Sequence, residues 1–434
     1  MIRRIILAAF LATAAYPALA HGQDSEPVAQ TVVHAGHLMA VPGEGYATEQ
    51  TLVIEDGRIV QVMAGYQTPE GATVVDLKDA YVLPGLIDSH VHILSENGPG
   101  QRLQGFIDSP ADMAFTGANH ARTTLMAGFT AVQDVGGNNE AVFALRDAIA
   151  AGKVPGPRMR TAGRAVAVTG GHGDVNGYNT RVLEMLTGAN ICNGADDCRR
   201  AVRQQVKEGA DLIKITATGG VLSNTSAGLE QQFTDAELEA IVEAATSMGR
   251  KVTAHAHGKS GVDAAIRAGV KSIEHGTYLD AESIALFKEN GAVLVPTVLA
   301  GVTVTGWTNE PWLPAASRAK AAIVGPQMID MLRRAHEGGV TVAYGTDTGV
   351  SAHGNNAQEF ALMVEAGFTP EEAIRSATVA ASEHLEMSDD IGTLVPGKFA
   401  DIIATTDDPL DDIRALEDID FVMQGGVVHK SISD

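Results

Sequence analysis

Six side chains that can bind metal ions stand at the ends of five apolar, β-type runs: His90, His92, Lys214, His255, His275 and Asp347. Residues i and i+2 of a strand point to the same side, so His90 and His92 can reach one ion together. Each residue alone has an ordinary structural explanation, such as a core histidine, a helix cap or half of an ion pair. The complete set is harder to explain in this way, because imidazoles and a carboxylate are ligands that Zn²⁺ and similar ions take. The pattern therefore predicts a metal centre.

Lys214 is a cationic residue inside the apolar run 211–216, where its side chain should face the same end of the fold as the histidines. Two ions about 3.5–4 Å apart need a bridging ligand. A neutral lysine amine reacts with CO₂ to give a carbamate with two anionic oxygens, and burial beside two cations favours that form. If two divalent metal ions are present, with zinc as the expected metal, N-carboxylated Lys214 can therefore bridge them. These ions would lower the pKa of a bridging water, whose proton Asp347 could accept while it binds one ion.

The strands expected to carry these side chains are eight short runs: 85–92, 129–134, 158–168, 212–216, 251–255, 271–275, 292–297 and 340–346. Helical patterns lie between most of them. Two of these begin with clear N-terminal signals, a capping box formed by Thr234 and Glu237, and Thr369 followed by Pro370 and Glu372. The alternation predicts an α/β fold with a (β/α)₈ TIM-like barrel, whose site lies at the carboxyl ends of the strands. A doubly wound sheet is the alternative, but no G-x-G-x-x-G motif opens a helix after a strand.

Both ends of the chain are rich in β-type runs. Residues 51–60 form two such runs around Asp56-Gly57, a strong hairpin signal, and residues 72–77 form another. Near the other end, similar runs cover 401–404, 421–423 and 427–428. We expect these segments to pair into one small β-sandwich domain. The predicted organisation is therefore a first part of the sandwich at 31–83, the metal-dependent barrel at 84–388 and the second part of the sandwich at 389–434.

The N-terminus has the pattern of a Sec-type signal peptide over residues 1–20. Arg3 and Arg4 precede an apolar run, 5–16, that is too short to span a bilayer, and an A-x-A cleavage site ends at Ala20. A retained N-terminal anchor is the alternative. The pattern predicts export to the periplasm or the medium.

The only two cysteines are Cys192 and Cys198. A metal site built from thiolates is improbable without a second pair. In an oxidising compartment a small local disulfide is the favoured interpretation, and two free thiols in a surface loop are the alternative.

The composition is that of a globular protein, with 45% hydrophobic and 19% charged residues. Lys and Arg together number 31 and Asp and Glu 53, which gives a net charge of −22. A surface this acidic repels phosphate backbones and anionic membranes, so we expect neither nucleic acid nor a membrane as a partner.

Taken together, these motifs resemble the amidohydrolase superfamily over nearly the whole chain after residue 20. The resemblance rests on the run Tyr81–His92 that enters the barrel, on Lys214, His255 and His275, and on the segments 345–347 and 397–403. Within the superfamily, segments 169–173, 215–220 and 255–258 are similar to the exported, imidazolonepropionase-like branch. Members of this branch are Xaa-Pro dipeptidases, carboxypeptidase-like enzymes and bacterial amidohydrolases that cleave N-acyl amino acids, including ochratoxin A.

The resemblance implies a binuclear centre. His90, His92 and Asp347 would hold one metal, His255 and His275 the other, and carboxylated Lys214 would bridge both. Many relatives are oligomers, so the resemblance also implies a homo-oligomer, with an octamer as one form.

Four further residues are candidates for substrate contacts. His172, in a glycine-rich loop after the third strand, could donate to the scissile carbonyl or hold a substrate carboxylate, and it could also be a loop-packing residue. His257 lies two residues beyond a ligand, and Tyr278 three residues beyond another. Arg164 on the third strand is a candidate clamp, because a guanidinium fork suits a carboxylate. With Asp347 as the group that moves the proton, Asp347 and His172 are the predicted catalytic residues.

We therefore expect a metal-dependent amide hydrolase of the carboxypeptidase-like type. Its partner would be a small-molecule or dipeptide substrate with a free carboxylate, from which it releases a C-terminal amino acid, and N-acyl amino acids of the ochratoxin A type fit this description. One alternative is a cyclic-amide hydrolase of the imidazolonepropionase type. Another is a metal-binding relative without turnover, although none of its six predicted ligands is missing.

Overall fold

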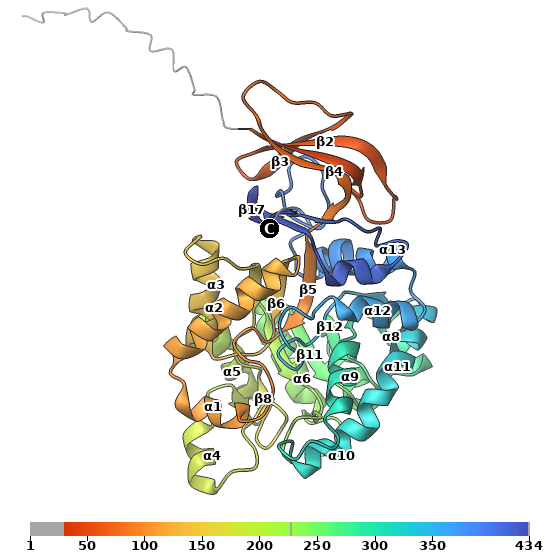
Figure 1. Ribbon diagram of the computed structural model, residues 1–434. Coiled ribbons are helices and arrows are strands. Elements are labelled where there is room, and N and C mark those ends of the chain that lie inside the picture. The colour runs from red at the N-terminus through yellow and green to blue at the C-terminus, as the bar shows by residue number, and fades with distance from the viewer. Residues whose placement is uncertain (1–29, 226–227, 433–434) are drawn as a thin grey trace, which may run out of the picture.

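The computed structural model describes residues 30–225 and 228–432. A small β domain lies at the top of Figure 1, and a larger α/β part lies below it. Each part has its own apolar core, which includes Leu52 and Ile402 in the small domain and Phe129 and Leu294 in the larger part. The predicted signal peptide lies outside the described residues, so its cleavage stays a prediction.

The small domain is one seven-stranded sheet that combines both ends of the described chain, in the order β17-β16-β15-β4-β1-β2-β3. Its strands are β1 (Thr31–Leu38), β2 (Ala47–Glu55), β3 (Arg58–Ala64), β4 (Thr73–Pro84), β15 (Ile402–Thr405), β16 (Phe421–Gln424) and β17 (Val427–Lys430). Strand β4 joins the two halves, because it pairs in parallel with β1 and antiparallel with β15. The prediction that both ends of the chain pair into one β domain is confirmed.

The hairpin between β2 and β3 turns at Asp56 and Gly57, as predicted. Their φ angles are 48° and 76°. Positive φ at both central residues is the conformation of the tight hairpin turns for which Asp-Gly is preferred. The last residues before the turn, such as Ile54, pair antiparallel with Ile59 and its neighbours.

The larger part contains parallel strands in two sheets, of order β10-β11-β12-β13-β14 and β5-β6-β7. These strands are β5 (Leu86–Val91), β6 (Phe129–Asp134), β7 (Arg158–Thr161), β10 (Ile213–Thr216), β11 (Val252–Ala256), β12 (Ser272–His275), β13 (Val293–Val295) and β14 (Thr341–Val342). Parallel bridges join both edges of one sheet to the other. Val91 pairs with Thr348, beyond β14, and Val166, beyond β7, pairs with Ile215 of β10.

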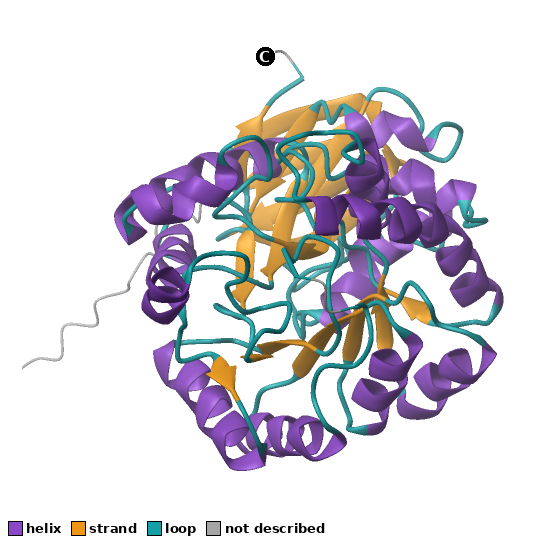
Figure 2. Ribbon diagram, turned by 90° about the horizontal axis from the view of Figure 1, so that it is seen from below, coloured by secondary structure: helices purple, strands orange, loops and turns teal. Residues whose placement is uncertain are grey.

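Helices surround these strands, as the view from below shows (Figure 2). They are α1 (Gln101–Ile107), α2 (Pro110–Met126), α3 (Asn139–Ala150), α4 (Thr180–Leu186), α5 (Ala195–Glu208), α6 (Asp235–Ser247), α7 (Lys259–Arg267), α8 (Ala281–Asn290), α9 (Val298–Gly306), α10 (Ala315–Val324), α11 (Met328–Glu337), α12 (Gln358–Glu365), α13 (Pro370–Arg375) and α14 (Ala381–His384), with single turns η1 (Gly325–Gln327), η2 (Ser376–Ala380) and η3 (Ile413–Glu417). In the described ranges, no helix combines the length and the apolar character that crossing a membrane needs.

Both predicted helix starts are present. Thr234 Oγ1 accepts a hydrogen bond from the backbone N–H of Glu237, whose carboxylate accepts from the N–H of Thr234. Thr369 and Glu372 form the same reciprocal pair at the start of α13. Each box satisfies N–H groups that the first turn of a helix leaves without an intrahelical partner.

The third predicted strand, 158–168, is not continuous. It is divided into β7 and β8 (Ala167–Val168), and β8 pairs with β9 (Ile191–Cys192) in a separate two-stranded sheet. Gly163 interrupts the strand, because its φ of 65° is not an extended conformation. Cys192 at the end of β9 is joined by a disulfide bond to Cys198 of α5, which confirms the predicted local disulfide.

Candidate functional site

A cavity of about 210 Å³, here the inner pocket, collects most of the predicted site residues. Its polar lining consists of His90, His92, His172, Lys214, Thr216, His255, His257, His275 and Asp347. The predicted ligands come from strand ends of both parallel sheets, which explains how residues far apart in the sequence meet. Its remaining wall is apolar and includes Val221, Val304 and Met328.

Asp347 lies between the two histidines of the first predicted strand. His90 is on β5 and His92 directly follows that strand. The distance from Asp347 Oδ1 to His90 Nε2 is 3.3 Å, and to His92 Nε2 it is 3.1 Å. Asp347 Oδ1 is nevertheless a buried atom without a hydrogen bond of acceptable geometry. An unsatisfied buried oxygen beside two imidazoles needs another partner.

The hydrogen bonds of His90 and His92 at Nδ1 indicate which nitrogen of each ring carries the proton. His90 Nδ1 donates to Glu274 Oε2 (2.6 Å) and His92 Nδ1 donates to Gly136 O (2.9 Å). A neutral ring protonated at Nδ1 has a lone pair at Nε2, so two nitrogen lone pairs face the Asp347 oxygen. Metal-binding histidines commonly donate their other nitrogen to a carboxylate or a carbonyl. The donor set therefore fits a divalent cation.

A second group of potential ligands consists of His255, His257 and His275, whose ligand atoms all lie within 4.8 Å of one another. His275 Nδ1 donates to Thr297 Oγ1 (2.6 Å), since that hydroxyl itself donates to Pro296 O. The ring nitrogen Nε2 of His275 is thereby left with its lone pair. Among the described residues, His275 also belongs with His90 and Asp347 to a second such group, so it lies between the two clusters.

Burial lowers the pKa of the basic side chains in the inner pocket. Burial lowers the pKa of Lys214, and the carboxylates of Glu274 and Asp347 oppose this shift only in part. Burial and the neighbouring imidazoles hold the pKa of His255 well below its usual range. The pKa of Glu274 is about 2, because Lys214 and His90 outweigh the opposing effect of burial. The pocket thus contains an ionised carboxylate behind His90 and a lysine whose pKa is lowered by burial.

Backbone strain is concentrated at the strand ends of this site. His275, Thr297 and Asp347 have φ angles of 72°, 51° and 58°, in the left-handed region that non-glycine residues seldom adopt. A buried carboxylate supports the turn at Asp347. Asp88 accepts hydrogen bonds from the Thr346 hydroxyl (2.6 Å) and from Asn356 (2.8 Å). These bonds tie β5 to the segment that carries Asp347.

His172 reaches the inner pocket from the glycine-rich loop after β8. Its Nδ1 is 2.5 Å from Ser223 Oγ, and its ring centroid is 4.1 Å from that of His255. Burial lowers the pKa of His172 to about 3, and the charges of His257, Lys214 and Lys320 contribute in the same direction. His172 is therefore a neutral imidazole at the edge of the metal-ligand cluster.

The other predicted substrate contacts are distributed differently. His257 lines the inner pocket, where its Nδ1 is 2.8 Å from Thr277 Oγ1. Arg164 is exposed and lines an adjoining cavity of about 850 Å³, here the outer cavity. Tyr278 lines neither of these two cavities. Its backbone N–H instead donates to His257 O.

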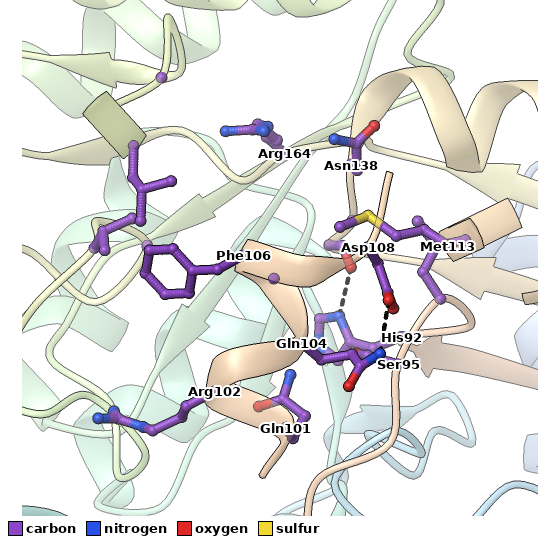
Figure 3. Close-up of a pocket in the computed structure, with 18 of the residues that line it drawn as sticks. His92, Ser95, Gln101, Arg102, Gln104, Phe106, Asp108, Met113, Asn138 and Arg164 are labelled. Carbon is purple, nitrogen blue, oxygen red and sulfur yellow. Dashed lines mark hydrogen bonds between the residues drawn. The ribbon is translucent and has the colours of Figure 1, made fainter. Parts of the chain in front are cut away.

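The outer cavity opens from the inner pocket, because His92, Gly136, Ala165 and Gly173 line both. Arg164 and Asn138 lie on one side of the outer cavity, and Gln101 and Arg102 of α1 lie on the other (Figure 3). Phe106 of α1 also lines it. A substrate in the inner pocket can therefore extend into a much larger and more polar space.

A third group of potential ligands, Glu96, His120 and His353, lies outside the inner pocket. The rings of His120 and His353 are stacked with centroids 4.2 Å apart and an interplanar angle of 19°. One nitrogen of each ring is bonded to a backbone carbonyl, His120 Nδ1 to Ile93 O (2.9 Å) and His353 Nε2 to Ser95 O (3.1 Å), and Glu96 is exposed. This group therefore lies apart from the predicted ligands.

Glu274, Thr297 and Asp88 were missed by the sequence analysis. Glu274 precedes His275 inside a buried strand, and a charged residue in an apolar run was the available signal. Asp88 offered the same signal two residues before His90. Thr297 follows an apolar run without any feature that distinguishes it from an ordinary helix cap.

Comparisons with known proteins agree with this geometry. Residues 81–434 match the amidohydrolase family. The chain is 33% identical over 426 residues to ochratoxinase from Aspergillus niger, covering 92% of this chain and 86% of that protein. A crystal structure of a Xaa-Pro dipeptidase with methionine bound in its active site is similar, with a TM-score of 0.88, 40% identity and coverage of 93% of this chain and 100% of that one. A prolidase complexed with N-methylphosphonate-L-proline has a TM-score of 0.85 and 31% identity, with coverage of 93% and 100%.

Proposed function

This chain belongs to the amidohydrolase family of metal-dependent hydrolases, and we propose that it hydrolyses the amide bond of dipeptides or N-acyl amino acids and releases the C-terminal amino acid. The observation that carries the proposal is the convergence of His90, His92 and Asp347 on one buried point next to an apolar pocket. The related dipeptidase and ochratoxinase support an amide bond beside an amino acid as the target.

We propose two divalent cations, with zinc as the metal. His90, His92 and Asp347 would hold one, His255 and His275 the other, and Lys214, carboxylated by CO₂, would bridge them. The buried environment of Lys214 supports this assignment, since its lowered pKa favours the neutral amine that reacts with CO₂. When bound, such cations polarise a carbonyl group and lower the pKa of a water molecule.

The protein's own side chains would then move the proton and orient the substrate. Asp347 Oδ1 lies at the centre of the ligand cluster, where its carboxylate can accept the proton of the attacking water and later deliver it to the leaving nitrogen. His172, a neutral imidazole at the edge of the cluster, donates a hydrogen bond to the substrate's carbonyl oxygen. The apolar wall around Val304 and Met328 excludes water from the reacting bond.

The free carboxylate of the substrate is assigned to Arg164 in the outer cavity. His257 in the inner pocket is a weaker candidate, because it is a neutral imidazole whose Nδ1 is already bonded to Thr277 Oγ1. Tyr278 is the weakest of the predicted contacts, because it lines neither cavity. The outer cavity, at about 850 Å³, has space for a bulky group, so ochratoxin A-type substrates belong to the proposed range.

The proposal also includes the predictions from the sequence on architecture, export and oligomeric state. The two parallel sheets would form one closed (β/α)₈ barrel spanning residues 84–388, and the small domain a β-sandwich formed by 31–83 and 389–434. The bridges at Val91 and Val166 support the closure. We also propose that the protein is exported after cleavage at residue 20, and that it is a homo-oligomer, with an octamer as one form.

The test is a substrate screen with a matched inactive variant. The zinc-loaded protein is incubated with dipeptides, N-acyl amino acids and ochratoxin A, and released amino acid is measured. Asp347→Asn keeps the shape and one oxygen ligand but is not basic, so it should fold and retain metal while kcat falls by at least about 10²-fold. A wild-type protein that releases no amino acid from any of these classes would contradict the proposal, and normal turnover by a metal-replete Asp347→Asn would contradict the role of Asp347.

A further inference from the structure

We propose that Ser223 and Lys320 are positioning residues that hold His172 in one tautomer, with its Nε2–H directed into the inner pocket. This inference rests on the proposed function, in which His172 donates a hydrogen bond to the substrate. Neither Ser223 nor Lys320 lines the inner pocket, so both would act through His172.

The contact between Ser223 and His172 determines which ring nitrogen can serve the substrate. Ser223 Oγ lies 2.5 Å from Nδ1, so Nε2 is the nitrogen left for the pocket. A neutral imidazole has one donor and one acceptor nitrogen. If the serine hydroxyl donates to Nδ1, the ring proton is at Nε2, where it can be donated to a carbonyl oxygen. The opposite arrangement would leave a lone pair at Nε2, which repels that oxygen.

Lys320 fixes the segment that carries Ser223. Its ammonium group, which extends from α10, donates to Gly220 O (2.6 Å) and to Ser223 O (2.8 Å). The residue is only 9% exposed, so these charge-assisted bonds are formed away from bulk water. Lys320 therefore connects both ends of the turn 220–223 to helix α10.

The ring of His172 is also restrained on its face and at its backbone. A Cβ atom at Gly220 would lie 2.3 Å from His172 Cε1, so the ring packs directly against a residue that must lack a side chain. The backbone N–H of His172 donates to Gln232 Oε1 (2.9 Å). With the ring face and the backbone fixed in this way, the hydroxyl of Ser223 is the contact that selects the tautomer.

A double-mutant cycle measures whether Ser223 acts through His172. We expect Ser223→Ala to lower kcat/KM by about 3-fold to 10-fold, the value of one hydrogen bond, and Ser223→Thr to restore it because the hydroxyl is kept. In a His172→Asn background, Ser223→Ala should have no further effect. Additive effects of the two substitutions would overturn the proposal, because a purely structural serine would act independently of His172.

Lys320→Met tests the second residue, with Lys398→Met as its matched control. Lys398 also donates to two backbone carbonyls, Ser388 O (2.6 Å) and Ile391 O (3.1 Å), but it lies away from the pocket. Lys320→Met should lower kcat/KM at unchanged metal content, and Lys398→Met should not. Equal losses in both variants would assign Lys320 a general structural role and overturn its part of the proposal.

A readout independent of turnover separates this inference from the proposed function. In ¹⁵N-histidine-labelled protein, the His172 signals are identified by their absence in His172→Asn. We expect Nδ1 without a proton and Nε2 with one in the wild type, and a mixture of tautomers in Ser223→Ala. A proton on Nδ1 in the wild type would overturn the inference even if the protein hydrolyses dipeptides. The expected tautomer in a protein without hydrolytic activity would instead contradict the proposed function alone.

Discussion

Replacing Glu274 by glutamine removes a negative charge behind a proposed metal ligand with little change of shape. The carboxylate is fully buried, and it accepts from His90 Nδ1 at 2.6 Å, from Ser272 Oγ at 3.2 Å and from Thr253. A glutamine oxygen can still accept from His90, and its NH₂ group can donate to the two hydroxyls. The hydrogen bonds of the variant therefore stay satisfied, and its fold should be kept.

The expected magnitude follows from the loss of charge assistance. A hydrogen bond to a charged group contributes about 1.5–3 kcal/mol and a neutral one about 0.5–1.5 kcal/mol. The difference, about 1–1.5 kcal/mol, corresponds to a roughly tenfold weaker metal site, at the lower end of the range for such supporting residues. The measurement is metal affinity by competition with a chelator, beside a thermal melt of the same preparation.

Glu237→Gln is the matched control for this experiment. Glu237 is buried at the start of α6, where it accepts from Gly194 N (2.6 Å) and from Thr234, and it does not line the inner pocket. Its substitution should lower the melting temperature and leave metal affinity unchanged. If Glu274→Gln binds metal as tightly as the wild type, the carboxylate does not strengthen His90 as a ligand, and the reasoning from the tautomer is refuted.

Three other predictions concern the bridge, the substrate and the pH dependence of stability. Lys214→Ala should lose most activity and at least one metal ion, and short-chain carboxylic acids should partly restore turnover; undiminished activity would remove the bridged centre. Amidating the substrate's carboxylate should lower kcat/KM by about tenfold to a hundredfold, the value of one charge-assisted contact, whereas equal turnover of acid and amide indicates a general amidase. Burial raises the pKa of Glu359 from 4.5 to about 8, although the N–H groups of Leu299 and Val298 oppose this. The folded chain therefore keeps a proton on Glu359 that the unfolded chain loses, so the contribution of this group to stability is lost as pH rises from 5 to 8. Over this range the melting temperature of the wild type should fall relative to that of Glu359→Gln.

The predictions that held depended on local patterns. Asp56-Gly57 specifies its turn through two residues, and Thr234 with Glu237 specifies a helix start through four. The prediction that His90 and His92 point to the same side followed from the two-residue period of side chains along a strand. Such signals need no knowledge of the rest of the chain.

The residues that were missed depend on contacts between distant segments. Glu274 meets His90 from 184 residues away, and Ser223 meets His172 from 51 residues away. Arg164 illustrates the converse case. It was expected to lie on a strand facing the pocket, but Gly163 breaks that strand and Arg164 projects into the outer cavity. A single glycine within the predicted strand therefore changes which cavity the side chain reaches.

The strained backbone at the strand ends shows why local propensity could not describe this site. Each left-handed non-glycine residue costs about 1–3 kcal/mol, and His275, Thr297 and Asp347 adopt this conformation together. Glycine at these positions would relieve the strain but would remove a proposed ligand or the hydroxyl that orients one. The hydrogen bonds of Asp88 to the segment before Asp347 supply part of the compensation. Substitutions that weaken the Asp88 contacts should therefore displace Asp347, because these hydrogen bonds hold the strained turn that carries it.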